Sequence, residues 1–97
     1  MLSIKFHPGA HEEFREATLW YNLQKEGLGL ELFEEVSKTL KLISEKPAIW
    51  PKYLDHFHRI ILKRFPYNIV YRVQDDYIEV IAIAHQKRKP SYWKNRI

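Results

Sequence analysis

The 97-residue chain contains no cysteine, which excludes disulfides, thiolate metal sites and cysteine nucleophiles. It has no apolar run close to the roughly 20 residues that a membrane-spanning helix needs, and its first residues lack the apolar core of a signal peptide. The dinucleotide-binding, P-loop, zinc-protease and nucleophile-elbow motifs are also missing. We therefore expect a cytoplasmic protein that uses no metal and no cofactor.

The charge that the chain does carry is unevenly distributed. Its net charge is +4, but the first 50 residues have a net charge of −2 and the remaining 47 a net charge of +6. The last thirteen residues hold five Lys or Arg side chains and no acidic one. This distribution fits either a solvated basic tail or an anionic partner, which would be a nucleic acid or an acidic protein segment.

Hydrophobic periodicity predicts one strand and two helices in the first half. Residues 2–6 alternate between apolar and polar side chains, as in a half-buried strand, and the Pro8-Gly9 pair ends that pattern. Apolar side chains then recur with helical spacing from residue 10 to about 25 and from 28 to about 45. Because a short glycine-containing turn separates the two segments, we predict an antiparallel helical hairpin.

The second half predicts strands. An aromatic-rich connection, which we expect to be packed down, leads to strand-like runs at residues 58–65, 66–73 and 77–84. The last run is apolar on both parities, which is typical of a strand that is covered on both faces or meets a partner. Short connections favour an antiparallel meander. We therefore predict a single α+β domain over residues 1–97, a two-layer β-α-α-β-β-β fold with an antiparallel sheet packed against the helical hairpin.

The acidic side chains of the two predicted helices are candidates for general acid–base pairs. Their positions opposite the apolar stripes predict a solvated face instead. These residues are Glu12, Glu13, Glu16, Glu31, Glu34 and Glu35.

The residues at the carboxyl-terminal end of the chain are the main candidates for a functional site. His85 ends the apolar last strand, so it would be held on a rigid element and would exchange protons near neutral pH. The lysines and arginine that follow would hold phosphates, and Tyr92 and Trp93 offer stacking faces for unpaired bases. This combination suits metal-free RNA cleavage. In the alternative, the charges are solvated or bind an acidic protein, and the rings pack on the sheet. For Trp93 we expect packing.

The sequence resembles the ParE/RelE toxin superfamily of type II toxin–antitoxin systems, which includes plasmid stabilisation proteins. The resemblance rests on residues 64–73 (RFPYNIVYRV) and 83–93 (IAHQKRKPSYW). Residues 20–21, 27–29 and 33, together with Pro47, also fit in the same order along nearly the whole chain. The resemblance implies a β-α-α-β-β-β fold and an antitoxin protein that wraps the toxin.

Two mechanisms follow from this resemblance. RelE-like members cleave mRNA on the ribosome without metal, whereas ParE-like members inhibit DNA gyrase and lack most of the acid–base residues. Asn68 stands where many of the ribonucleases have an arginine, and its amide cannot stabilise a developing phosphorane as a guanidinium would. The Phe65-Pro66-Tyr67 segment and the Arg-x-Pro-x-Tyr-Trp segment look closer to the ParE-like branch.

The leading hypothesis is therefore a gyrase-binding toxin that a cognate antitoxin neutralises. Its target-binding surface would consist of Lys87, Arg88, Lys89, Tyr92, Trp93 and Arg96. The alternative is an mRNA interferase, a metal-free endoribonuclease that acts on the ribosome and its mRNA. Its catalytic set would be His85 as acid or base, Arg64 and Arg88 on the phosphate, and Tyr92 orienting the substrate. A third hypothesis is an inactive or repurposed relative of these toxins that survives only as a binding module.

Overall fold

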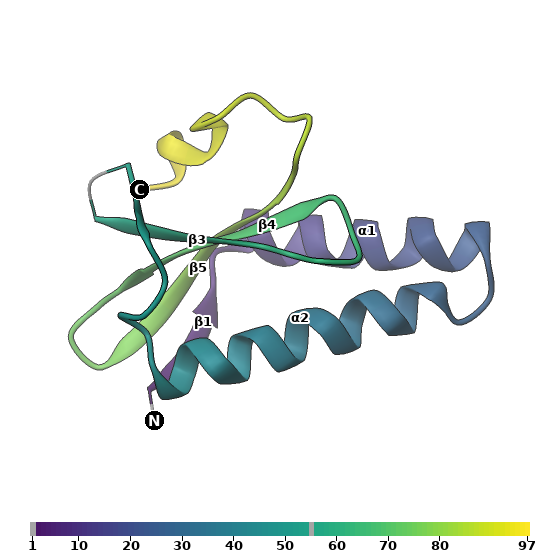
Figure 1. The fold of residues 1–97 in the computed structure, drawn as a ribbon. Helices are drawn as coiled ribbons and strands as arrows, with labels where there is room; N and C mark the ends of the chain where they lie inside the picture. The colour runs from purple at the N-terminus through teal and green to yellow at the C-terminus, as the bar shows by residue number, and fades with distance from the viewer. Residues whose placement is uncertain (1, 55) are drawn as a thin grey trace.

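The computed structural model describes residues 2–54 and 56–97 and shows two helices on one face of a sheet (Figure 1). The elements are β1 (Ser3–Phe6), α1 (Pro8–Gln24), α2 (Leu28–Glu45), β2 (Lys52–Tyr53), β3 (Phe57–Ile61), β4 (Tyr67–Val73), β5 (Tyr77–His85) and the short 3₁₀ helix η1 (Tyr92–Arg96). The α+β class and the β-α-α-β-β-β order are confirmed, with β2 as an additional short strand. Within the described part of the chain, neither α1 nor α2 is both long and apolar enough to cross a membrane.

The helical hairpin forms much as predicted, except at its start. Helix α1 begins at Pro8 rather than at residue 10, because His7 caps it: the Nδ1 atom of His7 accepts a hydrogen bond of 2.9 Å from the Gly9 N–H. Proline is favoured in the first helical turn, where its missing N–H is not needed. At the other end of α1, Gly27 adopts a φ of 88°, a left-handed conformation that turns the chain into α2.

The sheet has the strand order β1-β5-β4-β3-β2 and is mixed. The predicted antiparallel meander is present in β3, β4 and β5. The remaining pair differs from the prediction of an antiparallel sheet, because β1 pairs with β5 in parallel. Tight turns force antiparallel pairing, but β1 reaches the sheet through a long crossover that contains both helices, and such a crossover permits parallel pairing.

Strand β5 is buried on both faces, as its composition predicted. Its register against β4 shifts at Val70/Tyr71, so that Ile81 is the extra residue of a β-bulge. Before the bulge Val80 faces the helices, and after it Ile83 does so, whereas Ile81 joins the core on the opposite face. Apolar clusters on both faces therefore explain why residues 80–84 are all apolar, and the bulge decides which of them faces which cluster.

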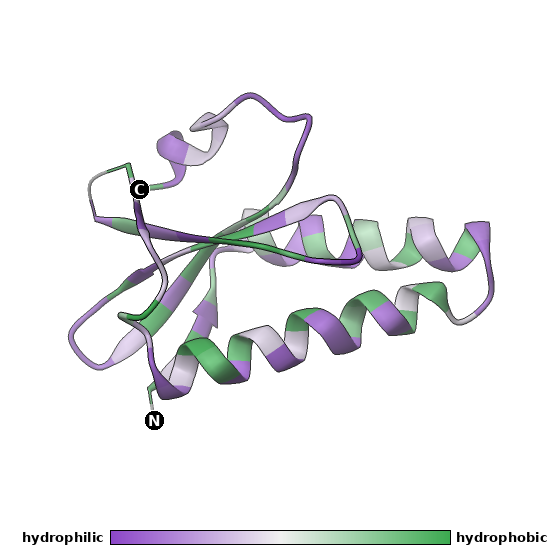
Figure 2. Cartoon of the chain, viewed as in Figure 1, coloured by the Kyte–Doolittle hydropathy of each residue, from purple (hydrophilic) through white to green (hydrophobic). Residues whose placement is uncertain are grey.

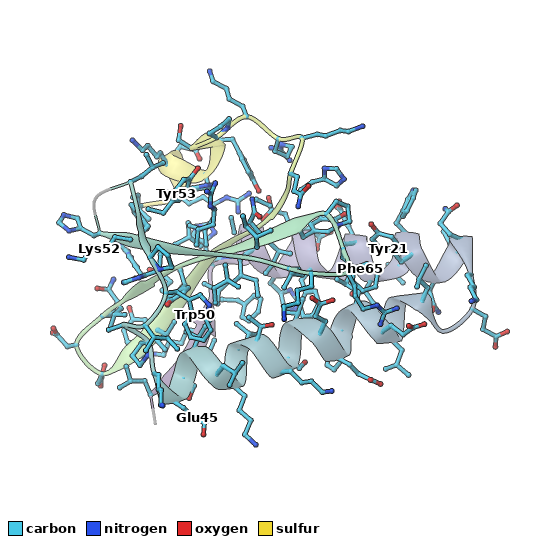
Figure 3. All side chains as sticks on the ribbon, viewed as in Figure 1. Tyr21, Glu45, Trp50, Lys52, Tyr53 and Phe65 are labelled. Atoms are coloured by element: carbon cyan, nitrogen blue, oxygen red, sulfur yellow. The ribbon has the colours of Figure 1, made fainter. Side chains whose placement is uncertain are left out.

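Side chains fill the space between the sheet and the hairpin (Figure 3). Tyr21 of α1 packs edge-on against Phe65, which follows β3, with ring centroids 5.0 Å apart (Figure 3). On the opposite face of the sheet lies the carboxyl-terminal segment, defined here as residues 86–97, which follows β5 and includes η1 (Figure 1). The sheet thus lies between α2 and this segment, whereas α1 reaches the segment beside the edge of β5, where Glu13 bonds to Tyr92 and Arg96.

Candidate functional site: the cleft beside the carboxyl-terminal segment

A cleft of about 370 Å³ lies where α1 meets the ends of β4 and β5 and the carboxyl-terminal segment. Its walls combine aromatic rings with charged groups. The lining residues are Glu13, Glu16, Ala17, Trp20, Tyr21, Tyr67, Ile83, His85, Arg88 and Tyr92. Three of the four residues proposed for catalysis therefore meet in one place, and two of them also belong to the proposed target-binding set.

The basic turn, defined here as Lys87, Arg88 and Lys89, is the exposed part of the site. Figure 2 shows the connection from β5 to η1 as hydrophilic, in contrast to the apolar strand that precedes it. Backbone hydrogen bonds fix the turn to the sheet: Gln86 N–H donates to the Pro66 carbonyl at 2.8 Å, and Arg88 N–H donates to the His85 carbonyl at 2.9 Å. Three cationic side chains thus project into solvent from an anchored loop.

His85 sits at the base of this turn, half-buried at the end of β5. Its ring packs edge-on against Tyr67, with centroids 5.1 Å apart. Its Nδ1 atom accepts a hydrogen bond of 3.0 Å from the Lys87 N–H. In the neutral ring this contact puts the proton on Nε2. The same hydrogen bond helps to order the basic turn.

Glu13 of α1 is the polar centre of the site, and the prediction that it lies on a solvated helix face is wrong. Its side chain is only 17% exposed. One carboxylate oxygen accepts hydrogen bonds of 3.0 Å from the Ile83 N–H and from Nη1 of Arg96, and the other accepts from the Tyr92 hydroxyl and, at 2.9 Å, from Nη2 of Arg96. Position 13 follows Ala10 by three residues and precedes Ala17 by four, so it falls on the buried face of α1, and this spacing was the signal that we missed.

Tyr92 links this carboxylate to the basic turn. The guanidinium of Arg88 lies 3.8 Å from the centroid of the Tyr92 ring, and that of Arg96 lies 5.3 Å from it. Burial, together with the hydrogen bond to Glu13, raises the pKa of the Tyr92 hydroxyl well above its ordinary value. The same carboxylate raises the pKa of Arg96 by hydrogen bonding. Tyr92 therefore keeps its proton and donates a hydrogen bond to Glu13.

Two members of the proposed target-binding set are not free to meet a target. Trp93 is only 2% exposed and packs edge-on against Phe57, with ring centroids 4.7 Å apart. The expectation that Trp93 packs is confirmed, and its place in a binding surface is corrected for the same reason. The Arg96 side chain is 17% exposed and is engaged by Glu13 and by the Ile81 carbonyl. Lys87, Arg88 and Lys89 remain accessible.

Arg64 does not join the other residues proposed for catalysis. It forms an exposed ion pair with Glu31 of α2 and lines a separate pocket with Glu34, Glu35 and Lys63. Hydrogen bonding within the pair raises the pKa of Arg64 and lowers that of Glu31. The proposed phosphate-binding pair of Arg64 and Arg88 is therefore divided between two sites.

Asn68, which stands where an arginine would strengthen a ribonuclease, lies in β4 opposite Ala84. Its Oδ1 atom is buried and has no hydrogen-bond partner among residues 2–54 and 56–97. A neutral amide thus occupies the position. In the same ranges of the chain, no three His, Asp or Glu side chains come together in a way that could hold a metal ion.

Comparison with known proteins gives a family-level match over most of the chain. Residues 4–90 match the family model described as the ParE toxin of the type II toxin–antitoxin system parDE. A protein named Toxin ParE2 from Mycobacterium tuberculosis (strain CDC 1551 / Oshkosh) is 25% identical over 89 residues, which cover 91% of this chain and 85% of that protein. The family-model match includes the basic turn but ends before η1.

Solved structures share the fold. A chain of the chromosomal ParDE toxin–antitoxin system from P. aeruginosa superposes with a TM-score of 0.75 at 18% identity, covering 88% of this chain and 96% of that one. The YoeB dimer from Staphylococcus aureus superposes with a TM-score of 0.62 at 20% identity, covering 87% and 95%. At these identities the similarity concerns the arrangement of helices and strands.

Proposed function

Because the chain belongs to the ParE toxin family of type II toxin–antitoxin systems, we propose that it arrests growth in the cytoplasm by binding DNA gyrase and that a cognate antitoxin neutralises it. The observation that carries the proposal is the basic turn, which presents three accessible cations on an anchored loop. Exposed cations next to a rigid strand favour association with an anionic surface and need no catalytic residue.

The disposition of the acid–base candidates supports binding over catalysis. The Tyr92 hydroxyl donates its hydrogen bond to Glu13, Nδ1 of His85 accepts a hydrogen bond from a backbone N–H, and Arg64 lies in another pocket. A phosphorane would need converging cations, and Asn68 supplies none. A gyrase-binding surface does not need cations that converge on one phosphate.

An antitoxin would complement the same charge. The second half of the chain has a net charge of +6, so an acidic partner segment is the chemistry that it favours. The proposal therefore expects an adjacent reading frame that encodes a small protein with an acidic, helix-forming segment, and expects that protein to co-purify with this chain and to abolish its inhibition.

The test is a supercoiling assay with purified gyrase and plasmid DNA. We expect the wild-type chain to inhibit gyrase and the triple variant Lys87→Ala/Arg88→Ala/Lys89→Ala to lose inhibition by at least about tenfold, since removing several contacting charges weakens association. The matched control Lys38→Ala/Lys41→Ala/Lys46→Ala removes three exposed positive charges from α2 and the residue after it, on the other side of the sheet. Equal inhibition by both triple variants would contradict the proposed surface, and no inhibition by the wild-type chain would contradict the proposed target.

The cleft favours one second candidate, an mRNA interferase, because His85, Arg88 and Tyr92 line the same cavity. Mapping mRNA ends after adding the chain to translating ribosomes separates the two functions. New ends that disappear in His85→Ala would establish the ribonuclease, whereas intact mRNA together with gyrase inhibition would eliminate it.

A further inference from the structure

The carboxyl-terminal segment is seated on the edge of β5 by side chains rather than by a strand. Strand β1 pairs with β5 only as far as Val80. Beyond that point Arg96 donates to the Ile81 carbonyl at 2.9 Å, and Glu13 accepts from the Ile83 N–H at 3.0 Å. The Glu13–Arg96 ion pair thus supplies hydrogen-bond partners to the backbone groups of β5 that β1 leaves unpaired, and it attaches η1 to this edge of the sheet.

Helix α1 is shaped to receive this ion pair. A Cβ atom placed on Gly9 would lie 2.7 Å from Cζ and 2.8 Å from Nε of Arg96. A side chain at position 9 would therefore push the guanidinium out of its seat. Gly9 and Glu13 are one helical turn apart on the same face of α1. Gly9 leaves room for the Arg96 guanidinium, and the Glu13 carboxylate binds it.

A direct chain of contacts runs from this seat to the basic turn. Glu13 accepts from the Tyr92 hydroxyl, and the Tyr92 ring lies 3.8 Å from the guanidinium carbon of Arg88. Charge-assisted hydrogen bonds of a partly buried carboxylate are strong and directional, so they fix the ring that supports Arg88. The exposed cation is therefore oriented by a largely buried carboxylate of α1, which acts through the Tyr92 ring.

From these contacts we propose that Glu13 is the positioning residue of the target-binding surface, docking the carboxyl-terminal segment and thereby presenting the basic turn in one orientation. The inference rests on the proposed function and adds to it how the surface is held. Glu13 acts through Tyr92 and Arg96 and makes no contact with the target itself.

The first test compares Glu13→Gln with Glu12→Gln. Both variants remove one negative charge from neighbouring positions of α1, but the partner of Glu12 is Arg15, which is itself exposed. We expect the amides of residues 92–97 to lose nearly all of their protection from hydrogen exchange in Glu13→Gln and to keep it in Glu12→Gln, with α2 amides equally protected in both. Gyrase inhibition should weaken at least about tenfold in Glu13→Gln alone, the factor expected when one molecule in ten keeps the segment docked.

A second variant removes the possibility that Glu13→Gln only unfolds the chain. Gly9→Ala alters no charge and replaces glycine by a better helix former, so the helix itself gains stability. It displaces Arg96, and we therefore expect the same local exchange and the same loss of inhibition with an unchanged or higher melting temperature. A merely structural role for the seat would predict that inhibition follows the melting temperature instead.

A double-mutant cycle tests the route through Tyr92. Tyr92→Phe removes the hydroxyl and keeps the ring beneath Arg88, so its effect should be contained within that of Glu13→Gln, and the double variant should inhibit no less than Glu13→Gln alone. Additive losses would overturn this route.

The outcomes separate the two proposals. Unchanged exchange in Glu13→Gln, or faster exchange with full inhibition, overturns the positioning role while the proposed function stands. A wild-type chain that does not inhibit gyrase overturns the proposed function, and the exchange comparison still decides whether Glu13 holds the segment.

Discussion

The two faces of the sheet are held together by different means. On the helical face a continuous apolar core joins both helices to all of the long strands, and residues such as Leu32, Val36 and Ile43 are fully buried in it. On the opposite face the buried cluster is small and centres on Trp93, and the segment depends in addition on the single carboxylate of Glu13. Broad apolar burial stabilises a whole domain, whereas one ring and one polar centre hold a local element.

This difference implies two levels of stability. If the packing between the helices and the sheet is lost, the main core is exposed and the chain unfolds, because few contacts would remain to hold the strands together. If the packing of the carboxyl-terminal segment on the sheet is lost, residues 86–97 are released and the rest of the chain stays folded. The chain would then lose the proposed binding surface without losing its fold, and mutations on the two faces should show this difference.

The largest effect is expected from Leu32→Ala, which truncates a fully buried side chain of α2. Such truncations cost about 2–5 kcal/mol of the free energy of unfolding. Trp93→Ala removes more atoms, yet it should cost less than Leu32→Ala, because undocking of the segment limits the loss while α2 stays protected. Denaturant unfolding gives the two free energies, and amide exchange shows whether the loss is global or confined to residues 92–97.

Leu42→Ala is the matched control for this contrast. Leu42 is also a leucine of α2 but is 54% exposed, so its truncation should change the free energy of unfolding by no more than about 0.5 kcal/mol. A Trp93→Ala variant as unstable as Leu32→Ala, with faster exchange throughout the chain, would show that the two faces fold as one unit.

Alkaline pH should destabilise the helical face through Tyr71, which lies in the core on that side of the sheet. Its hydroxyl donates to the Pro47 carbonyl at 2.7 Å, and burial raises its pKa from 10 to about 12. Above pH 10 the unfolded chain loses this proton while the folded chain keeps it, so stability is intact below pH 10 and falls as the pH rises towards 12. The full loss from this group is about 2–3 kcal/mol.

The measurement is denaturant unfolding between pH 9 and 12 for the wild type and for Tyr71→Phe. The variant should lose about 1 kcal/mol at neutral pH with its hydrogen bond, and should show a shallower decline above pH 10. Burial also raises the pKa of Tyr92, so part of the decline should persist in the variant. An identical decline in both proteins would mean that Tyr71 does not control alkaline stability.

Local pattern was enough to predict the helical face. The helical spacing of residues 28–45 and the doubly apolar run of residues 77–84 are properties of neighbouring residues, and both elements formed where periodicity placed them. The parallel pairing of β1 and the bulge at Ile81 depend on how distant strands align, and periodicity does not encode that. The start of α1 was missed because His7 caps it through its side chain, a role that the Pro-Gly pair concealed.

The site was predicted less completely, for the same reason. His85, Arg88 and Tyr92 converge because they lie close together along the chain, at the end of β5 and just after it. Glu13 joins them from 79 residues away in sequence, through a hydrogen bond to Tyr92 that only the folded sheet creates. Arg64 is closer in sequence to His85 than Glu13 is, yet it lies in a different pocket. Proximity along the chain therefore misled us about both residues.

The smallest effect is expected from Arg64→Ala, which tests whether the helical face takes any part in function. Arg64 forms an exposed pair with Glu31, and solvent screens such pairs, so gyrase inhibition should change by less than about twofold. Arg88→Ala is the matched control, because it removes the same charged group from the basic turn and should weaken inhibition clearly. Equal losses in the two variants, or cleavage of mRNA that depends on Arg64, would show that the pocket beside Glu31 belongs to the working surface and that the division between the two faces does not extend to function.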